Sequence, residues 1–316
     1  MGNHTERLNP ITLVLIQTIP HTICRWFRVF LIVAAYGYLA YALLTFEQYG
    51  EFAAHFSNAG WRERFPLALA VLLFPLNISM ESEKWRSLLW EIVQLSRKES
   101  HRQVYYGFVG ALLTPDRLGD YPARASLLPD GVSKLQAIAL GFTGSMVLAA
   151  VNIAAGIIAL LVCGMELPNL EHRQLILLSA ILLIFFVAIC CLMAFSSKCQ
   201  TLQKMPKLPL RQLARVVGLS ACRYLIFSLQ LYCLLLFAGA ELTATDCLLA
   251  IPIYYLVLTL LPALPAADPA LRGGVGMVVF GAFTDNIPAV ALATVLLWII
   301  NNLFSLIIGT LVRKNA

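Results

Sequence analysis

The sequence predicts an all-α fold, a polytopic helical membrane protein, and three observations support this. Of the 316 residues, 59% are hydrophobic and only 13% are charged, whereas soluble domains have about 45–50% apolar and about 25% charged residues. Several apolar runs reach the roughly 20 residues that cross a bilayer as a helix. Basic residues gather in the short loops between these runs. This composition excludes a disordered chain, collagen, a coiled coil and a secreted disulfide scaffold.

Seven apolar runs are long enough to be predicted as full spans. They are Trp26–Phe46, Phe65–Met80, Leu135–Gly164, Leu175–Phe195, Val216–Ala240, Cys247–Pro265 and Pro288–Val312. Two further segments, Val104–Leu113 and Gly273–Phe283, have about half that length and are predicted to be short broken or re-entrant helices. We therefore expect one transmembrane domain over residues 25–312. It follows a cytoplasmic or interfacial segment at 1–24 and precedes a short tail at 313–316.

Loop charges predict the orientation in the membrane. The loop from Lys198 to Arg215 carries five basic residues and no acidic one, which by the positive-inside rule predicts a cytoplasmic position. Counting spans back from it places residues 81–134 and the N-terminus on the cytoplasmic side. The expected location is the cytoplasmic (inner) membrane, crossed many times. The C-terminal tail is cytoplasmic if Gly273–Phe283 crosses the bilayer, and outside if this segment re-enters.

A charged strip follows the first short segment. Thr114 and Pro115 are residue types of a helix N-cap and first helical position, so a helix is predicted from there until Pro122 breaks it. That helix would place four charges on one face: Asp116, Arg117, Asp120 and Arg124. Arginine makes paired hydrogen bonds to phosphate. The strip is therefore interpreted as a binding site for a zwitterionic or anionic headgroup, beside a polar cavity. The alternative is a salt-bridged loop.

Arg223 is the charge that lies deepest in a predicted span. An arginine within a span is costly and is a functional candidate by default. We expect it to point into the protein, toward residues 262–276 or 114–120, with Asp268 or Asp116 as its partner. The alternative is that the side chain extends along the helix to the membrane interface.

Arg272 begins a glycine-rich segment that contains Gly273, Gly274 and Gly276. These glycines are expected to allow close backbone approach and positive φ at the second half of the site; tight helix packing is the alternative. Glu81 and Arg86 extend the second span and are assigned either to a headgroup vestibule or to a solvated helix end.

The run Thr114–Asp120 resembles the "TPgRxGE" signature of the lysylphosphatidylglycerol synthase transmembrane-region family. The helix over Asn77–Arg86 and the segment Leu264–Gly276 are similar to the same family, and the resemblance covers roughly residues 25–312. The sequence departs from the family pattern at Asp120, where glutamate is usual. Asn301–Asn302 also occupy a region in which the family often has arginine.

The resemblance implies a lipid flippase or translocator for a polar or lipid-linked headgroup, with membrane lipids as partners. A soluble aminoacyltransferase domain has no room in this chain, so enzyme activity is not the leading expectation. One alternative is a membrane-embedded transferase that acts on a lipid headgroup, with Asp116 or Asp120 as base. The other is a non-catalytic membrane partner of a glycosyltransferase. A homo-oligomer is compatible with the sequence; no cofactor, metal or nucleic acid is expected.

Overall fold

The computed structural model describes residues 60–114, 117–166, 208–261 and 265–314. Within these ranges helix is the only regular secondary structure, which confirms the all-α prediction for this part of the chain. The helices are α4 (Trp61–Leu88), α5 (Arg97–Leu113), α6 (Asp120–Ser126), α7 (Lys134–Glu166), α9 (Leu210–Ala238), α10 (Ala244–Leu260), α11 (Asp268–Phe280), α12 (Ile287–Trp298), the π-helix η2 (Ile299–Leu303) and α13 (Phe304–Lys314).

Four helices in the described ranges are long and apolar enough to cross a membrane. They cover Arg64–Leu88, Lys134–Cys163, Leu210–Ala238 and Ile287–Leu311, and they match four of the seven predicted spans. A membrane protein is therefore supported, but seven spans are not confirmed. Two other predicted spans, Trp26–Phe46 and Leu175–Phe195, lie outside the described residues, as does the segment 1–24.

The predicted span Cys247–Pro265 is not confirmed as a full span. The corresponding helix α10 has 17 residues and ends at Leu260. At 1.5 Å per residue it is about 26 Å long, which is shorter than the roughly 30 Å hydrocarbon core of a bilayer. Apolar residues continue as far as Leu261, but the proline at 262 favours an extended conformation for the residue before it.

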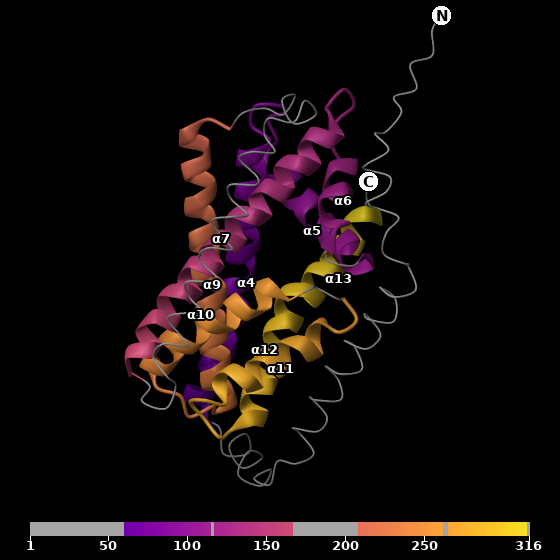
Figure 1. Cartoon of the computed structure of the whole chain (residues 1–316). Helices are drawn as coiled ribbons and strands as arrows, with labels where there is room; N and C mark the ends of the chain where they lie inside the picture. The colour runs from indigo at the N-terminus through magenta and orange to yellow at the C-terminus, as the bar shows by residue number, and fades with distance from the viewer. Residues whose placement is uncertain (1–59, 115–116, 167–207, 262–264, 315–316) are drawn as a thin grey trace, which may run out of the picture.

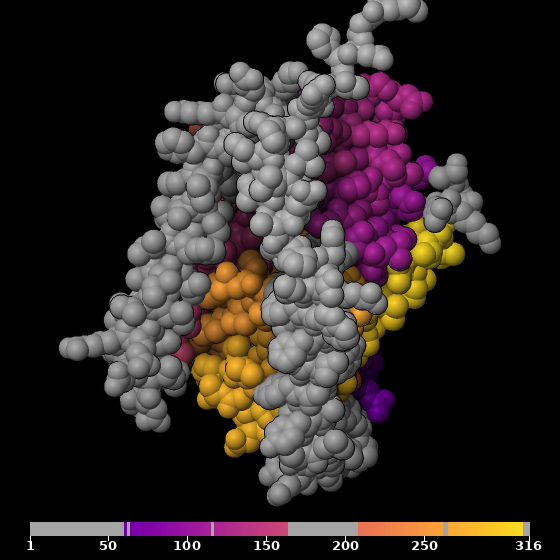
Figure 2. Space-filling view, turned by 45° about the vertical axis from the view of Figure 1, so that its right-hand side comes forward, coloured from indigo at the N-terminus to yellow at the C-terminus, as the bar shows by residue number. Residues whose placement is uncertain are grey.

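The long helices α4 and α9 pack side by side through the centre of the bundle, and α7 and α12 both pack against α9 (Figure 1). The α5–α6 hairpin and α13 lie at one end, shown at the upper right of Figure 1. In Figure 2 the yellow C-terminal helix runs beside the purple and magenta segment that holds α5 and α6, in agreement with the packing of α13 on α5. Ala70 and Ile78 of α4, and Leu231 and Leu234 of α9, are fully buried residues of the hydrophobic core.

The two short predicted segments correspond to helices that do not meet the length and hydropathy of a span. Val104–Leu113 is the second half of α5, which starts earlier because Ser96 and Glu99 form a capping box. Hydrogen bonds from Ser96 also lower the pKa of the Glu99 carboxyl group. The second segment starts earlier than predicted, since α11 begins at Asp268, and its 13 residues are only about 20 Å long.

The predicted helix from Thr114 is also wrong. Thr114 is the C-cap of α5, in an extended conformation, and α6 begins only at Asp120. The Thr114 hydroxyl donates to the Gly110 carbonyl (3.0 Å) and accepts from the Gly119 amide (2.7 Å), so it closes the turn between the two helices. Pro122 lies in the first turn of α6, where its missing N–H is tolerated. It therefore does not break the helix.

Two facing glycines let α5 and α6 approach closely. A Cβ on Gly110 would meet the Gly119 carbonyl oxygen and the Ala123 side chain, and a Cβ on Gly119 would meet the Gly110 carbonyl oxygen. We expect Gly110→Ala to lower the free energy of unfolding by about 1–3 kcal/mol, because overpacking forces the backbone apart. Thermal unfolding of the detergent-purified variants measures this change.

Gly218→Ala is the matched control, since a Cβ there meets nothing within 4 Å. Its change should be within about 1 kcal/mol, the difference in helix propensity between glycine and alanine. Equal melting temperatures for the two variants would show that the α5–α6 contact is not tight.

Candidate functional site

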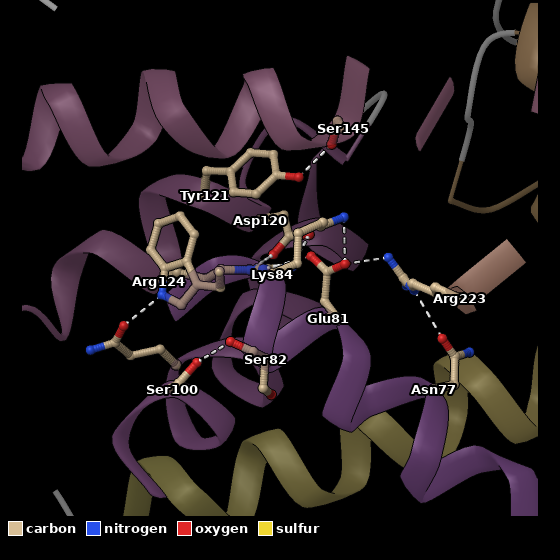
Figure 3. A network of polar contacts seen from close by, with 12 residues as sticks. Asn77, Glu81, Ser82, Lys84, Ser100, Asp120, Tyr121, Arg124, Ser145 and Arg223 are labelled. Carbon is tan, nitrogen blue, oxygen red and sulfur yellow. Dashed lines mark hydrogen bonds and ion pairs between the residues drawn. The ribbon is translucent and has the colours of Figure 1, made fainter. Parts of the chain in front are cut away.

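A buried carboxylate on α4, Glu81, organises the polar interior of the bundle. Glu81 is only 2% exposed and accepts from three cations: Lys84 at 2.7 Å, Arg124 at 2.8 Å, and Arg223. Figure 3 shows Glu81 between Arg124 on one side and Arg223 on the other, with Lys84 above it. The three cations come from α4, α6 and α9. The Glu81 carboxylate therefore connects these three helices through ion pairs.

Arg124 is a structural residue of this network. Its Nε and a terminal nitrogen donate to the two carboxylate oxygens of Asp120, at 2.6 and 2.9 Å. Its guanidinium lies over the rings of Trp85 and Tyr121. Burial alone would lower the pKa of Arg124, but the carboxylates of Asp120 and Glu81 raise it above its usual range. The prediction that Arg124 lines a polar cavity is therefore wrong, because each of its three guanidinium nitrogens already donates to a carboxylate and the side chain is only 2% exposed.

A cavity of about 210 Å³ lies next to this network. Three arginines from different segments line it: Arg117 from the turn before α6, Arg223 from α9, and Arg272 from α11. We call this space the arginine cavity. Its other lining residues are Asn77, Ile78, Phe108, Asn152, Phe227, Tyr255, Leu258, Thr259, Leu297, Trp298, Asn301 and Asn302. None of the described lining residues is a carboxylate, although Glu81 pairs with Arg223 and Asp268 pairs with Arg272. Arg117 has no such partner among the described residues, so the cavity favours an anion.

Arg117 is held in an unusual backbone conformation. Its φ is +57°, a region that residues other than glycine adopt uncommonly and that concentrates at functional sites. One terminal nitrogen donates to Asn302 Oδ1 at 3.0 Å, and the guanidinium lies over the ring of Phe108. Burial lowers the pKa of Arg117, yet a guanidinium stays protonated in proteins. Within the described residues no carboxylate lies within ion-pair distance of it.

Arg223 points into the protein, as expected, but its partners differ from those predicted. It donates to Glu81 and, through Nε, to Asn77 Oδ1 at 2.9 Å. Asp268 instead binds Arg272 Nε at 3.0 Å. The prediction failed because α9 packs along α4, which brings a carboxylate that is distant in sequence beside the arginine.

The π-helix η2 supplies the amides on the far side of the cavity. Asn301 Oδ1 accepts from Asn77 Nδ2 at 2.7 Å, and Asn302 Oδ1 accepts from Arg117. A π-turn inside a helix is rare and occurs often at functional sites. The two adjacent amides thereby link α4 to the turn that carries Arg117.

The glycines of α11 are packing residues. Gly273, Gly274 and Gly276 lie inside the helix and are buried, and none of them has a positive φ. A Cβ on Gly276 would lie 2.9 Å from Thr294 Cγ2. The expected positive φ is wrong, since α11 begins before these glycines. Their close approach to α12 agrees with the alternative of tight helix packing.

Two other predicted site residues do not line the arginine cavity. Arg86 pairs with Glu83 at 2.7 Å, in a cluster at the end of α4. Asp120 is occupied by Arg124. Asp116 lies outside the described residues. Of the three described residues of the predicted strip, only Asp120 and Arg124 pair on one helix, because Arg117 lies in the turn before α6.

Two amides of the cavity, Asn77 and Asn152, are not among the predicted site residues. Both lie inside long apolar helices, where polar side chains are uncommon and face the protein interior. That signal identifies them as candidates, but their convergence with the arginines depends on helix packing.

No protein-family model matches the chain, and no curated protein is similar to it at a significant level.

Proposed function

We propose that the protein is a membrane translocator that takes the polar headgroup of an anionic lipid into the arginine cavity. The observation that carries the proposal is the convergence of Arg117, Arg223 and Arg272 on one cavity, with no carboxylate among the described residues that line it. The planar guanidinium group matches the oxygens of phosphate and binds them in pairs. Charged groups inside a membrane protein typically mark the path of a polar substrate.

The size of the cavity supports a headgroup as the occupant. At about 210 Å³ it is smaller than the roughly 300–1,000 Å³ of pockets for drug-sized ligands. Acyl chains would remain in the bilayer while the phosphate enters between the helices. The expected seven spans, the cytoplasmic membrane and the cytoplasmic N-terminus are part of this proposal, as is the likeness to the lipid-flippase family.

The transferase alternative needs a base at the cavity. Asp120 was a candidate, but both of its carboxylate oxygens bind Arg124, and it does not line the cavity. This arrangement disfavours Asp120 as the base; the other candidate, Asp116, lies outside the described residues. A role beside a glycosyltransferase stays a prediction from the resemblance.

Transport by reconstituted protein tests the proposal. Proteoliposomes with an acyl-labelled phosphatidylglycerol are treated with a membrane-impermeant quencher, and the protein-dependent rate of headgroup exposure is measured. We expect Arg223→Leu to lower this rate by at least about tenfold, because a charge-assisted hydrogen bond to phosphate is lost. The fold should persist, because Glu81 keeps Lys84 and Arg124 as partners.

Arg215→Leu is the control on the same helix. Arg215 is 56% exposed and makes only a 3.4 Å contact to Glu83, so its removal should leave the rate unchanged. Translocation that is unaffected by Arg223→Leu, or the absence of protein-dependent translocation of any anionic lipid, would refute the proposal.

A further inference from the structure

A series of side-chain amides connects the cavity arginine Arg223 to a backbone carbonyl of α4. Arg223 Nε donates to Asn77 Oδ1 at 2.9 Å (Figure 3). Asn77 Nδ2 in turn donates to Asn301 Oδ1 at 2.7 Å, and Asn301 Nδ2 donates to Gln230 Oε1 at 3.2 Å. Gln230 Nε2 ends the series at the Ala70 carbonyl, 2.9 Å away. We call the side chains of Asn77, Asn301 and Gln230 the amide chain.

The two ends of the amide chain fix the orientation of every amide in it. A guanidinium nitrogen can only donate, so the atom of Asn77 that faces Arg223 must be the oxygen. A backbone carbonyl can only accept, so the atom of Gln230 that faces α4 must be the nitrogen. These two requirements, applied from opposite ends, assign the same orientation to Asn301 between them. The Leu297 carbonyl agrees with it, since it also accepts from Asn301 Nδ2, at 3.0 Å.

Gln230 is the member of the amide chain that lies away from the cavity. It is fully buried and is not among the described residues that line the arginine cavity, whereas Asn77 and Asn301 are. It lies about two turns beyond Arg223 on α9 and on the same face of that helix. Because Gln230 has no exposed surface, it can act on an occupant of the cavity only through its neighbours.

We infer that Gln230 is a positioning residue for Arg223 and acts through Asn301 and Asn77. This inference rests on the proposed function, because it explains how one arginine of the headgroup site is oriented. Glu81 holds a terminal nitrogen of Arg223 and the amide chain holds Nε, so two contacts on different atoms fix the guanidinium plane. Gln230 holds the Asn301 amide in the orientation that this arrangement requires. A preorganised donor loses less conformational entropy when it binds a ligand.

The first test measures the positioning of Arg223 without any ligand. Gln230→Met removes both hydrogen bonds of Gln230 and keeps an unbranched side chain of similar length. The Arg223 Nε–H resonance is followed by NMR in the detergent-purified full-length protein with isotope-labelled arginine, and it is assigned by its absence in Arg223→Leu. We expect Gln230→Met to exchange this proton with water at least about threefold faster, because the hydrogen bond to Asn77 is weakened.

Ser220→Ala is the control on the same helix. Ser220 is fully buried, and its hydroxyl has no hydrogen-bond partner among the described residues. Its removal should leave the exchange of the Arg223 Nε–H proton unchanged. An equally slow exchange in Gln230→Met would overturn the inference.

A double-mutant cycle tests whether this positioning affects an occupant of the cavity. Calorimetry measures the affinity of the protein for glycerol phosphate, a soluble headgroup. We expect Gln230→Met to lower this affinity about three- to tenfold, both alone and together with Arg117→Asn, because Arg117 has its own acceptor in Asn302. Together with Arg223→Leu it should have no further effect, since substitutions that act through one contact are not additive. An equal loss in the Arg223→Leu background would overturn the inference, because it would indicate a general effect on the fold.

The two measurements separate this inference from the proposed function. Faster proton exchange in Gln230→Met without any change in affinity would overturn the role of Gln230 at the site and leave the proposed function intact. The absence of protein-dependent translocation, together with faster exchange in Gln230→Met, would refute the proposed function and leave the positioning of Arg223 intact.

Discussion

Replacing Glu81 with glutamine is expected to lower the free energy of unfolding by about 3–5 kcal/mol, the typical effect of breaking a buried ion pair. The Glu81 carboxylate is 2% exposed and contacts Lys84, Arg124 and Arg223. Glutamine has nearly the same shape but carries no charge, so Lys84 and Arg223 would lose their carboxylate partner among the described residues and Arg124 would keep only Asp120. Their mutual repulsion would then oppose the packing of α4 against α6 and α9.

Glu83→Gln is the matched control for this prediction. Glu83 lies two residues further along α4 and also contacts three arginines, but it is 18% exposed and two of its partners, Arg97 and Arg215, are mostly exposed. Its loss should change stability by about 1 kcal/mol or less. Thermal unfolding and size-exclusion profiles in detergent measure both variants. A Glu81→Gln protein as stable as Glu83→Gln would contradict the central role of Glu81.

Arg117→Asn is expected to separate function from stability. Asparagine adopts positive φ more readily than arginine does, so the substitution suits a backbone with φ of +57°. The described residues hold no carboxylate that would be left unpaired by it. Headgroup affinity and translocation should fall roughly 10- to 100-fold, because a hydrogen bond to a charged group contributes about 1.5–3 kcal/mol. The melting temperature should stay constant or rise.

Arg211→Asn is the matched control for Arg117→Asn. Arg211 lies in the exposed first turn of α9 and does not line the arginine cavity. Binding and translocation should be unchanged in this variant. Normal translocation by Arg117→Asn would show that the turn between α5 and α6 does not contact the substrate.

The four long helices could be predicted because a run of about 20 apolar residues has few alternatives to a spanning helix. Residue types that usually mark a helix end predicted the helix boundaries less reliably. Thr114 has the residue type of an N-cap, but the same hydroxyl closes a turn here, since it bonds to Gly110 and Gly119. Residue type alone does not distinguish these two uses, because both satisfy free backbone groups with a side-chain oxygen.

The candidate site was predictable in its residue types but not in its pairings. Arg117, Arg223 and Arg272 stood out because charges are rare in so apolar a chain. Their partners depend on tertiary packing: Glu81 is 142 residues from Arg223, and Asn302 is 185 residues from Arg117. The distinction between the sealed Arg124 and the cavity-lining Arg117 follows from where α6 starts, which the sequence pattern placed too early.

The most direct test of the account is to locate the bound headgroup. A phosphatidylglycerol analogue with a photoreactive group on its glycerol is crosslinked to the protein in liposomes, and the modified residues are mapped by mass spectrometry. The account predicts modification at cavity residues such as Asn152, Thr259 and Trp298, and competition by unlabelled phosphatidylglycerol. Crosslinks confined to exposed apolar positions such as Ile158 and Leu248, without competition, would contradict headgroup entry into the arginine cavity.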